Sequence, residues 1–432
     1  MKKSVVAGLV LLALIVIISP GLMGYLAERS VDKQLEWAAD DNQEIVISAA
    51  GFERGWFFSE GEHRVEFAST GPGAALRQQL GFAATGTPAL IINTRLDHGL
   101  IPVSSMNRDE GSLLPGLGRA ISHLSIENAD GEVSALPGVV YTQVGLTGAV
   151  SSHYILEPGA VEETSWGAAD ITVKTSASQD TMEFEGQVDA LRIAGGNEQL
   201  ETGDMQFSGA LVETGFGFSV GDLALTIASV GLKSAEQSVR FEPLSLRSHS
   251  RLSGGRVDGD MDFDISINSP AQPDAITLTL HGSAADIDGT AFGRLLAGLK
   301  KARRIEDPMQ AYALIENDLQ TLFEKGFEID IDTLNLELPE GTMRSSLTMA
   351  ARESAANPLA RTGLLLALEA RADVSIPAGL FDYIAARNPG FQSAAAMGFL
   401  RRNGDNYELA AEYKKGLLTV NGAPMPIPLP GR

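Results

Sequence analysis

Residues Gly217–Gly221 read GFSVG and match the G-x-S-x-G pattern that surrounds a nucleophilic serine. That chemistry needs a sharp turn between a strand and a helix, so that the hydroxyl is exposed and backbone amides can stabilise an oxyanion. Here the next residues, 222–227, alternate between polar and apolar as a strand does. We therefore interpret Ser219 as a strand residue and not as a nucleophile.

Asp258, Asp260, Asp262 and Asp264 occupy every second position. A calcium loop of the EF-hand type would need glycine at its sixth position, where this chain has Phe263. In a strand, the four carboxylates would instead line one face, with the apolar residues between them on the other. The spacing favours a solvated strand face, and a weak divalent-cation surface is the alternative.

The chain also lacks the residues that other catalytic and cofactor sites require. The chain has no cysteine, which excludes disulfides, thiolate nucleophiles and Cys-ligated metals. Its six histidines include no pair at ligand spacing, and residues 293–300 lack the Lys-Ser/Thr pair of a phosphate-binding loop. We predict no catalytic residue, no cofactor, no metal and no enzymatic activity.

Two clusters could contact lipid or another protein. The aromatic cluster could also be buried packing, and the basic cluster could simply complement the dipole at the C-terminal end of a helix. The candidate residues are Trp56, Phe57 and Phe58 in the first cluster and Lys300, Lys301, Arg303 and Arg304 in the second.

The N-terminus predicts where in the cell the protein is located. Lys2 and Lys3 precede an uncharged stretch, residues 4–27, which as a helix would reach about 36 Å and could cross a hydrocarbon core of about 30 Å. The positive-inside rule keeps the lysines in the cytoplasm. An uncleaved anchor fits better than a cleaved signal peptide, because Tyr25 and Leu22 would occupy positions that require small residues. A buried core helix is the third alternative.

After a short helix over 28–41, the period of the sequence changes to two, and from about 121 to 285 it is almost purely that of strands. Helices are expected near 290–326, with Asp307-Pro308 beginning one and Gly326 ending it, and over 379–387 and 394–402. Strands are expected again at 328–331, 333–338, 345–351 and 407–420.

These elements predict a mainly β protein with some α. It would have an N-terminal transmembrane helix, then a large antiparallel body made of a rolled or curved sheet with a few packed helices. The expected divisions are an anchor over 1–27, a membrane-proximal α/β segment over 28–120, an antiparallel β region over 121–285, and an α+β region over 286–432 that continues the same body.

Composition limits the partners. Lys+Arg 33 against Asp+Glu 55 gives a formal net charge of −22, which argues against nucleic acid because phosphate binding needs a basic surface. The hydrophobic content of 44% is consistent with a folded body and not with a disordered chain.

Three segments in order resemble a known family. FERGWFFS at 52–59 follows the N-terminal anchor, HGLIP at 98–102 follows a strand, and GLLTVNG closes the segment 407–422. This order resembles the YdgA-type family of Gram-negative bacterial envelope proteins, whose function is unknown. The resemblance implies an inner-membrane anchor with a periplasmic body, and it transfers no catalytic residue.

Two functions follow from these observations. The first is a non-enzymatic, single-pass inner-membrane protein whose periplasmic sheet binds lipid or another hydrophobic ligand in a groove. The second is an envelope scaffold or interaction module with a filled core, which binds another envelope protein or itself. The two differ in whether side chains fill the apolar side of the sheet.

Overall fold

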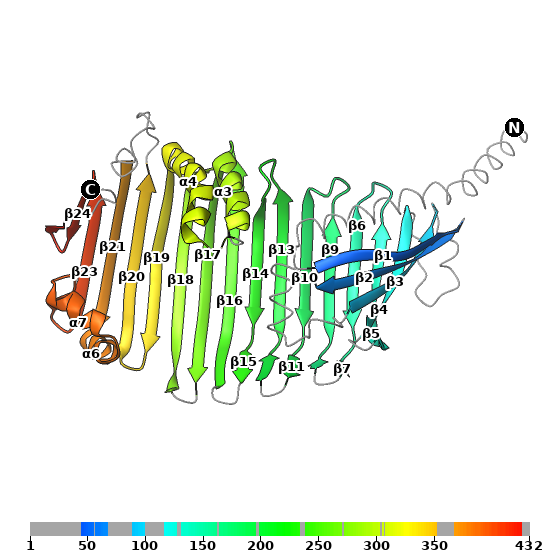
Figure 1. The fold of residues 1–432 in the computed structure, drawn as a ribbon, viewed down its shortest axis with the longest axis horizontal. Coiled ribbons are helices and arrows are strands. Elements are labelled where there is room, and N and C mark those ends of the chain that lie inside the picture. Colours follow the sequence, from blue (N-terminus) through cyan, green and yellow to red (C-terminus); the bar gives the residue numbers. More distant parts are fainter. Residues whose placement is uncertain are drawn as a thin grey trace, which may run out of the picture. The chain divides into compact units, whose positions relative to one another are not determined.

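The computed structural model describes most of the chain outside the first 44 residues, and the described part is largely antiparallel strand (Figure 1). The described ranges are 45–55, 57–67, 89–99, 116–127, 131–161, 164–195, 198–233, 238–269, 272–302, 305, 307–351 and 367–425. The chain forms two compact units, residues 1–196 and 197–432. A mainly β fold with a large antiparallel sheet and some helix is therefore confirmed.

In the first unit, eight strands pair in the order β1–β2–β3–β4–β5–β6–β9–β10, and three short ones in the order β7–β8–β11. Their bounds are β1 Ile45–Arg54, β2 Phe58–Phe67, β3 Ala89–His98, β4 Gly118–Glu127, β5 Val133–Val144, β6 Val150–Leu156, β7 Gly159–Val161, β8 Thr164–Trp166, β9 Ala169–Thr175, β10 Thr181–Val188 and β11 Leu191–Gly195.

The second unit has a longer series of antiparallel neighbours, β13–β14–β16–β17–β18–β19–β20–β21–β23–β24–β25. β12 pairs with β15, β15 with the start of β16, and β22 with β23. The bounds are β12 Glu198–Thr202, β13 Met205–Glu213, β14 Ser219–Ile227, β15 Val230–Lys233, β16 Ser238–Ser253, β17 Arg256–Ser269, β18 Gln272–Asp288, β19 Phe327–Leu338, β20 Gly341–Ala351, β21 Leu368–Pro377, β22 Arg401–Asn403, β23 Asn406–Lys414, β24 Leu417–Val420 and β25 Ala423–Met425.

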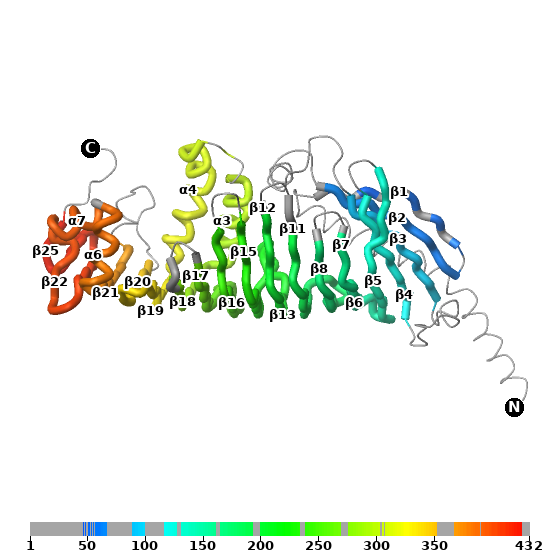
Figure 2. Tube along the Cα trace, turned by 90° about the horizontal axis from the view of Figure 1, so that it is seen from below, coloured from blue at the N-terminus to red at the C-terminus, as the bar shows by residue number. Residues whose placement is uncertain are grey.

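Four helices lie in the described part of the chain, all in the second unit: α3 Gly289–Ala302, α4 Pro308–Lys325, α6 Ala378–Arg387 and α7 Pro389–Ala396. α4 begins and ends as predicted. The Asp307 side chain accepts a hydrogen bond from the backbone N–H of Met309 at 2.8 Å, and Gly326 ends the helix at a positive φ of 83°. Figure 2 shows that α3 and α4 project from the sheet.

The predicted helix over 394–402 is wrong. Asn388 does not only end α6; its side chain also accepts from the N–H of Gly390 at 3.0 Å, and Pro389 takes the first position of α7. α7 therefore begins earlier than predicted and ends at Ala396, and residues 401–403 form β22. The Asn-Pro pair ends one helix and begins the next.

Inserted residues shift the register locally in β16 and β19, among other strands. In β16, the pairing with β17 shifts between Phe241 and Leu244. In β19, Ile331 and Thr333 lie opposite consecutive residues of β18, which leaves Asp332 as the inserted residue of a bulge. The predicted strands 328–331 and 333–338 are thus one strand that contains this bulge.

The predicted anchor over 1–27 and the helix over 28–41 lie outside the described residues. Among the helices that the structure does describe, none combines the length and the apolar sequence that a membrane crossing would require.

Candidate functional site

One side of the second unit's sheet carries an apolar patch that continues across five neighbouring strands. Each strand alternates, and the antiparallel register aligns the apolar positions across neighbouring strands. One row runs from Leu225 through Leu246, Phe263 and Leu280 to Leu334. We call two such rows the central apolar face, which consists of Leu225, Ile227, Leu244, Leu246, Phe263, Ile265, Leu278, Leu280, Leu334 and Leu336.

The central apolar face is not a closed core. All ten of its side chains are half-buried. On the same side of the sheet, Leu223 and Met261 keep 39% and 41% of their surface exposed. Five adjacent strands at ~4.8 Å spacing extend about 19 Å. The face therefore offers an apolar strip longer than the roughly 15 Å that an acyl chain occupies in one leaflet of a bilayer.

Helices cover this side of the sheet at its edges. α6 and α7 form a core with the ends of β19, β20, β21 and β23 (Figure 1), in which Leu380, Phe381 and Ile376 are buried. The ring of Phe381 stacks on Tyr407 with centroids 3.8 Å apart. Under these two helices, the apolar side chains of the sheet therefore form part of a buried core.

α3 and α4 cover the opposite ends of the strands. Phe323 of α4 meets Phe327 of β19 edge to face at 5.1 Å, and Phe327 is buried. Phe292 of α3 meets Phe218 in the turn before β14 at 5.2 Å. Packed aromatic rings therefore close the central apolar face at the end that lies under α3 and α4. At the other end, the core under α6 and α7 includes Leu338 of β19, the strand at the margin of the face.

The other side of the same sheet is polar, and the four aspartates of β17 lie there. Asp262 pairs with His281 at 2.6 Å, and this hydrogen bond, together with neighbouring carboxylates, raises the pKa of His281. Asp258 accepts a hydrogen bond from its neighbour's backbone N–H, that of Asp286, which lowers the pKa of Asp258. The expected solvated strand face accounts for these contacts.

Within the described residues, no group of three or more His, Asp or Glu side chains is placed to hold a metal ion. Ser219 opens strand β14, which runs to Ile227, so the strand-to-helix turn of a nucleophile elbow is replaced by a strand. The polar side of the sheet carries hydrogen bonds and ion pairs, such as the pair of Asp262 with His281.

The predicted aromatic cluster lies in the first unit. Phe57 and Phe58 are both exposed, and the guanidinium of Arg95 stacks 3.9 Å from the centroid of the Phe58 ring. Trp56 lies outside the described residues. The two described phenylalanines are therefore surface residues at the start of β2, and their contact with lipid or protein stays a prediction.

The predicted basic cluster lies in the second unit. Lys300 and Lys301 are exposed in the last turn of α3, where cations complement the helix dipole. Arg303 and Arg304 lie outside the described residues. Neither cluster contributes to the central apolar face. The alternation of polar and apolar residues predicted the strands of that face, but it did not predict which strands are neighbours in the sheet.

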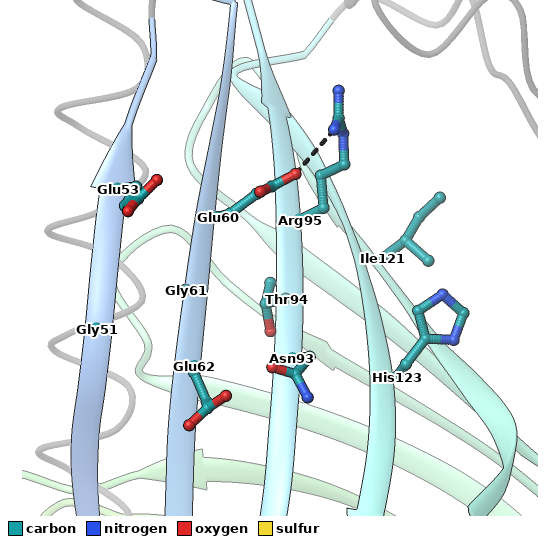
Figure 3. Close-up of a pocket in the computed structure, with 10 residues that line it drawn as sticks. All are labelled: Gly51, Glu53, Glu60, Gly61, Glu62, Asn93, Thr94, Arg95, Ile121 and His123. Atoms are coloured by element: carbon teal, nitrogen blue, oxygen red, sulfur yellow. Dashed lines mark hydrogen bonds and ion pairs between the residues drawn. The ribbon is translucent and has the colours of Figure 1, made fainter. Parts of the chain in front are cut away.

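A polar hollow of about 530 Å³ lies on β1–β4 of the first unit (Figure 3). Glu60 binds Arg95 at 2.8 Å, while Glu53, Glu62 and His123 reach into the hollow from β1, β2 and β4. Three carboxylates against one guanidinium make it acidic. It was not predicted from sequence, because its residues come from four strands, and the connections from β2 to β3 and from β3 to β4 are long.

Behind this hollow is a buried polar pair. On the opposite face of the same strands, Ser59 Oγ and His98 Nε2 are 3.2 Å apart and both residues are almost fully buried. A serine beside a histidine suggests nucleophile chemistry, but a substrate could not reach this hydroxyl without opening the sheet. We interpret the pair as a satisfied hydrogen bond in the core.

Comparison with known proteins identifies a family that the sequence matches. The family model described as "Bacterial protein of unknown function (DUF945)" matches residues 1–428. No curated protein and no solved structure matches the chain.

Proposed function

The chain belongs to this bacterial family of unknown function, and from that premise we propose that it is a non-enzymatic, membrane-anchored envelope protein that binds lipid or another hydrophobic ligand. Residues 4–27 would anchor it in the inner membrane, with the body in the periplasm. The ligand would lie on the central apolar face.

A single observation carries the ligand proposal: the central apolar face is half-buried although α3 and α4 pack over one end of its strands. Apolar surface left in water is unfavourable by about 25 cal/mol per Å². A hydrophobic ligand on these side chains would recover part of that free energy. Its polar end would need to leave the face, since none of the ten side chains offers a hydrogen bond.

Neighbouring residues on β17 give a matched test. We would place a photo-crosslinking benzoylphenylalanine at Phe263, on the central apolar face, or at Asp264, on the polar side, in the full chain expressed in a bacterium. The proposal predicts lipid adducts in the mass spectrum for Phe263 and none for Asp264. Only protein adducts at Phe263 would instead support the interaction module. Equal lipid adducts at both positions would contradict a ligand specific to this face.

The proposed location of the body in the periplasm can be tested separately. A reporter enzyme that is active only in the periplasm, fused after residue 40, should be active. Activity of a cytoplasmic reporter at the same position, with none from the periplasmic one, would overturn the assigned topology while leaving the apolar face unaffected.

A further inference from the structure

The helical hairpin formed by α3 and α4 is buried at its base and exposed at its tip. The buried residues of α3 are Gly289, Ala291, Gly293 and Leu295, all in its first half. None of the 18 residues of α4, every one of which is described, is buried. Figure 2 shows the pair projecting from the sheet. The tip therefore makes no core of its own.

The hairpin is nevertheless built firmly. Gly298 allows the two helices to approach closely, because a Cβ there would lie 3.0 Å from Ile315 Cγ2. Arg294 pairs with Asp318 across the helices at 3.5 Å. Asp307 caps α4 at the tip, where its carboxylate is occupied by the N–H of Met309. These contacts between α3 and α4, together with the N-cap at Asp307, support the structure of the tip.

Large apolar side chains are exposed at this tip. Met309 is 75% exposed and Tyr312, one turn later, is 50% exposed. Leu299, in the last turn of α3, is also exposed. Lys300 and Lys301 follow it at once. Apolar and tyrosine side chains beside lysines form the pattern that lies at the surface of an anionic bilayer, where the rings sit at headgroup level.

We propose that the α3–α4 tip contacts the surface of a bilayer that contains anionic phospholipid. The charge distribution supports this partner. The chain has a net charge of −22, so most of it is repelled by an anionic surface, whereas the lysine pair beside the exposed apolar residues is attracted to it. The tip is too small for a stable protein interface, which needs about 20–30 residues a side. This contact rests on the proposed membrane anchoring but not on ligand binding by the central apolar face.

The absence of cysteine makes the test direct, because one introduced cysteine is unique in the chain. The full chain carrying Met309→Cys, labelled with a fluorophore, would be reconstituted into vesicles of phosphatidylethanolamine and phosphatidylglycerol, with and without brominated phospholipid. Met397→Cys is the control, since Met397 is 66% exposed at the end of α7. Both positions are on the surface, so neither label should disturb folding.

Quenching by brominated lipid is expected at position 309 and not at position 397. Lys300→Glu with Lys301→Glu should reduce that quenching in these vesicles and leave it unchanged where phosphatidylglycerol is omitted. Flotation of the same sample separates the failures. If the chain floats with the vesicles and position 309 is not quenched, the tip contact is wrong and the anchoring stands. If the chain does not float, both are wrong. A label shielded from an aqueous quencher but not reached by brominated lipid would identify a second chain as the occupant and overturn the proposal.

Discussion

The core under α6 and α7 and the central apolar face belong to the same side of one sheet, yet they differ in burial. Leu380 is fully buried between helix and strands, whereas Leu246 and Phe263 remain half-buried. The strands supply the same kind of side chain in both places. What differs is the helical cover, so period-two alternation produces an apolar surface, and the connections decide where that surface becomes a core.

The largest effect should separate these two places. Leu380→Ala removes packing from a closed core and should lower the free energy of unfolding by about 2–5 kcal/mol. Leu246→Ala, on the central apolar face, should cost less than about 2 kcal/mol because water already reaches its side chain. Denaturant unfolding followed by circular dichroism measures both. Equal losses would mean that the central face is as well covered as the core.

A second change acts on the base of the helical cover. A Cβ at Gly293 would lie 2.1 Å from the carbonyl oxygen of Phe216, so Gly293→Ala must push α3 away from the turn before β14. We expect a loss of about 1–3 kcal/mol. Gly298→Ala is the comparison variant: its Cβ would meet side chains only, the nearest being Ile315 Cγ2 at 3.0 Å, so we expect a smaller loss than from a clash with backbone. Similar unfolding midpoints for the two variants would show that the base of α3 is not tightly seated.

A third change concerns the tip of that cover. Asp307→Ala removes the N-cap of α4 and should cost about 1 kcal/mol, while Asp307→Asn keeps an acceptor and should be nearly neutral. Because α4 has no buried residue to hold its first turn, the loss should be local. Hydrogen exchange of the amides of residues 309–312 should quicken in the alanine variant only. Quickened exchange spread through β19 would contradict a local role.

The smallest effect lies on the polar side. The hydrogen bond to Asp262 raises the folded-state pKa of His281, so its stabilisation is complete below the unfolded pKa near 6.5 and disappears as pH rises through the folded pKa. Both side chains are well exposed, and screening should keep the contribution below about 0.5 kcal/mol. Asp262→Asn should lower the His281 pKa measured by NMR titration. An unchanged pKa would show that the pair does not persist in solution.

Local chemistry was predictable from the sequence. Asp307-Pro308 and Gly326 mark the ends of α4 because capping depends on neighbouring residues. The apolar side of most strands followed from alternation. The helix predicted over 394–402 has the wrong bounds because Asn388 and Pro389 begin a new helix directly after α6.

The site was less predictable than the strands that form it. Residues as distant as Leu225 and Leu336 share the central apolar face through a register that no local pattern specifies. Whether helices would lie over these strands depends on packing between elements far apart in sequence. The candidates chosen from sequence, such as Phe57 and Lys300, were chosen for local density of one residue type, and they lie elsewhere.

The bulge at Asp332 has a consequence for how the chain can change in length. Because Ile331 and Thr333 already face consecutive residues of β18, and Thr333 and Leu334 would face consecutive residues of β20, deleting Asp332 leaves an uninterrupted ladder with every leucine on its present side. Deleting Asn335 instead would turn Leu336 and Leu338 toward water. The same strand therefore contains one position where the loss of a residue keeps every side chain on its side, close to positions where it would invert the rest of the strand.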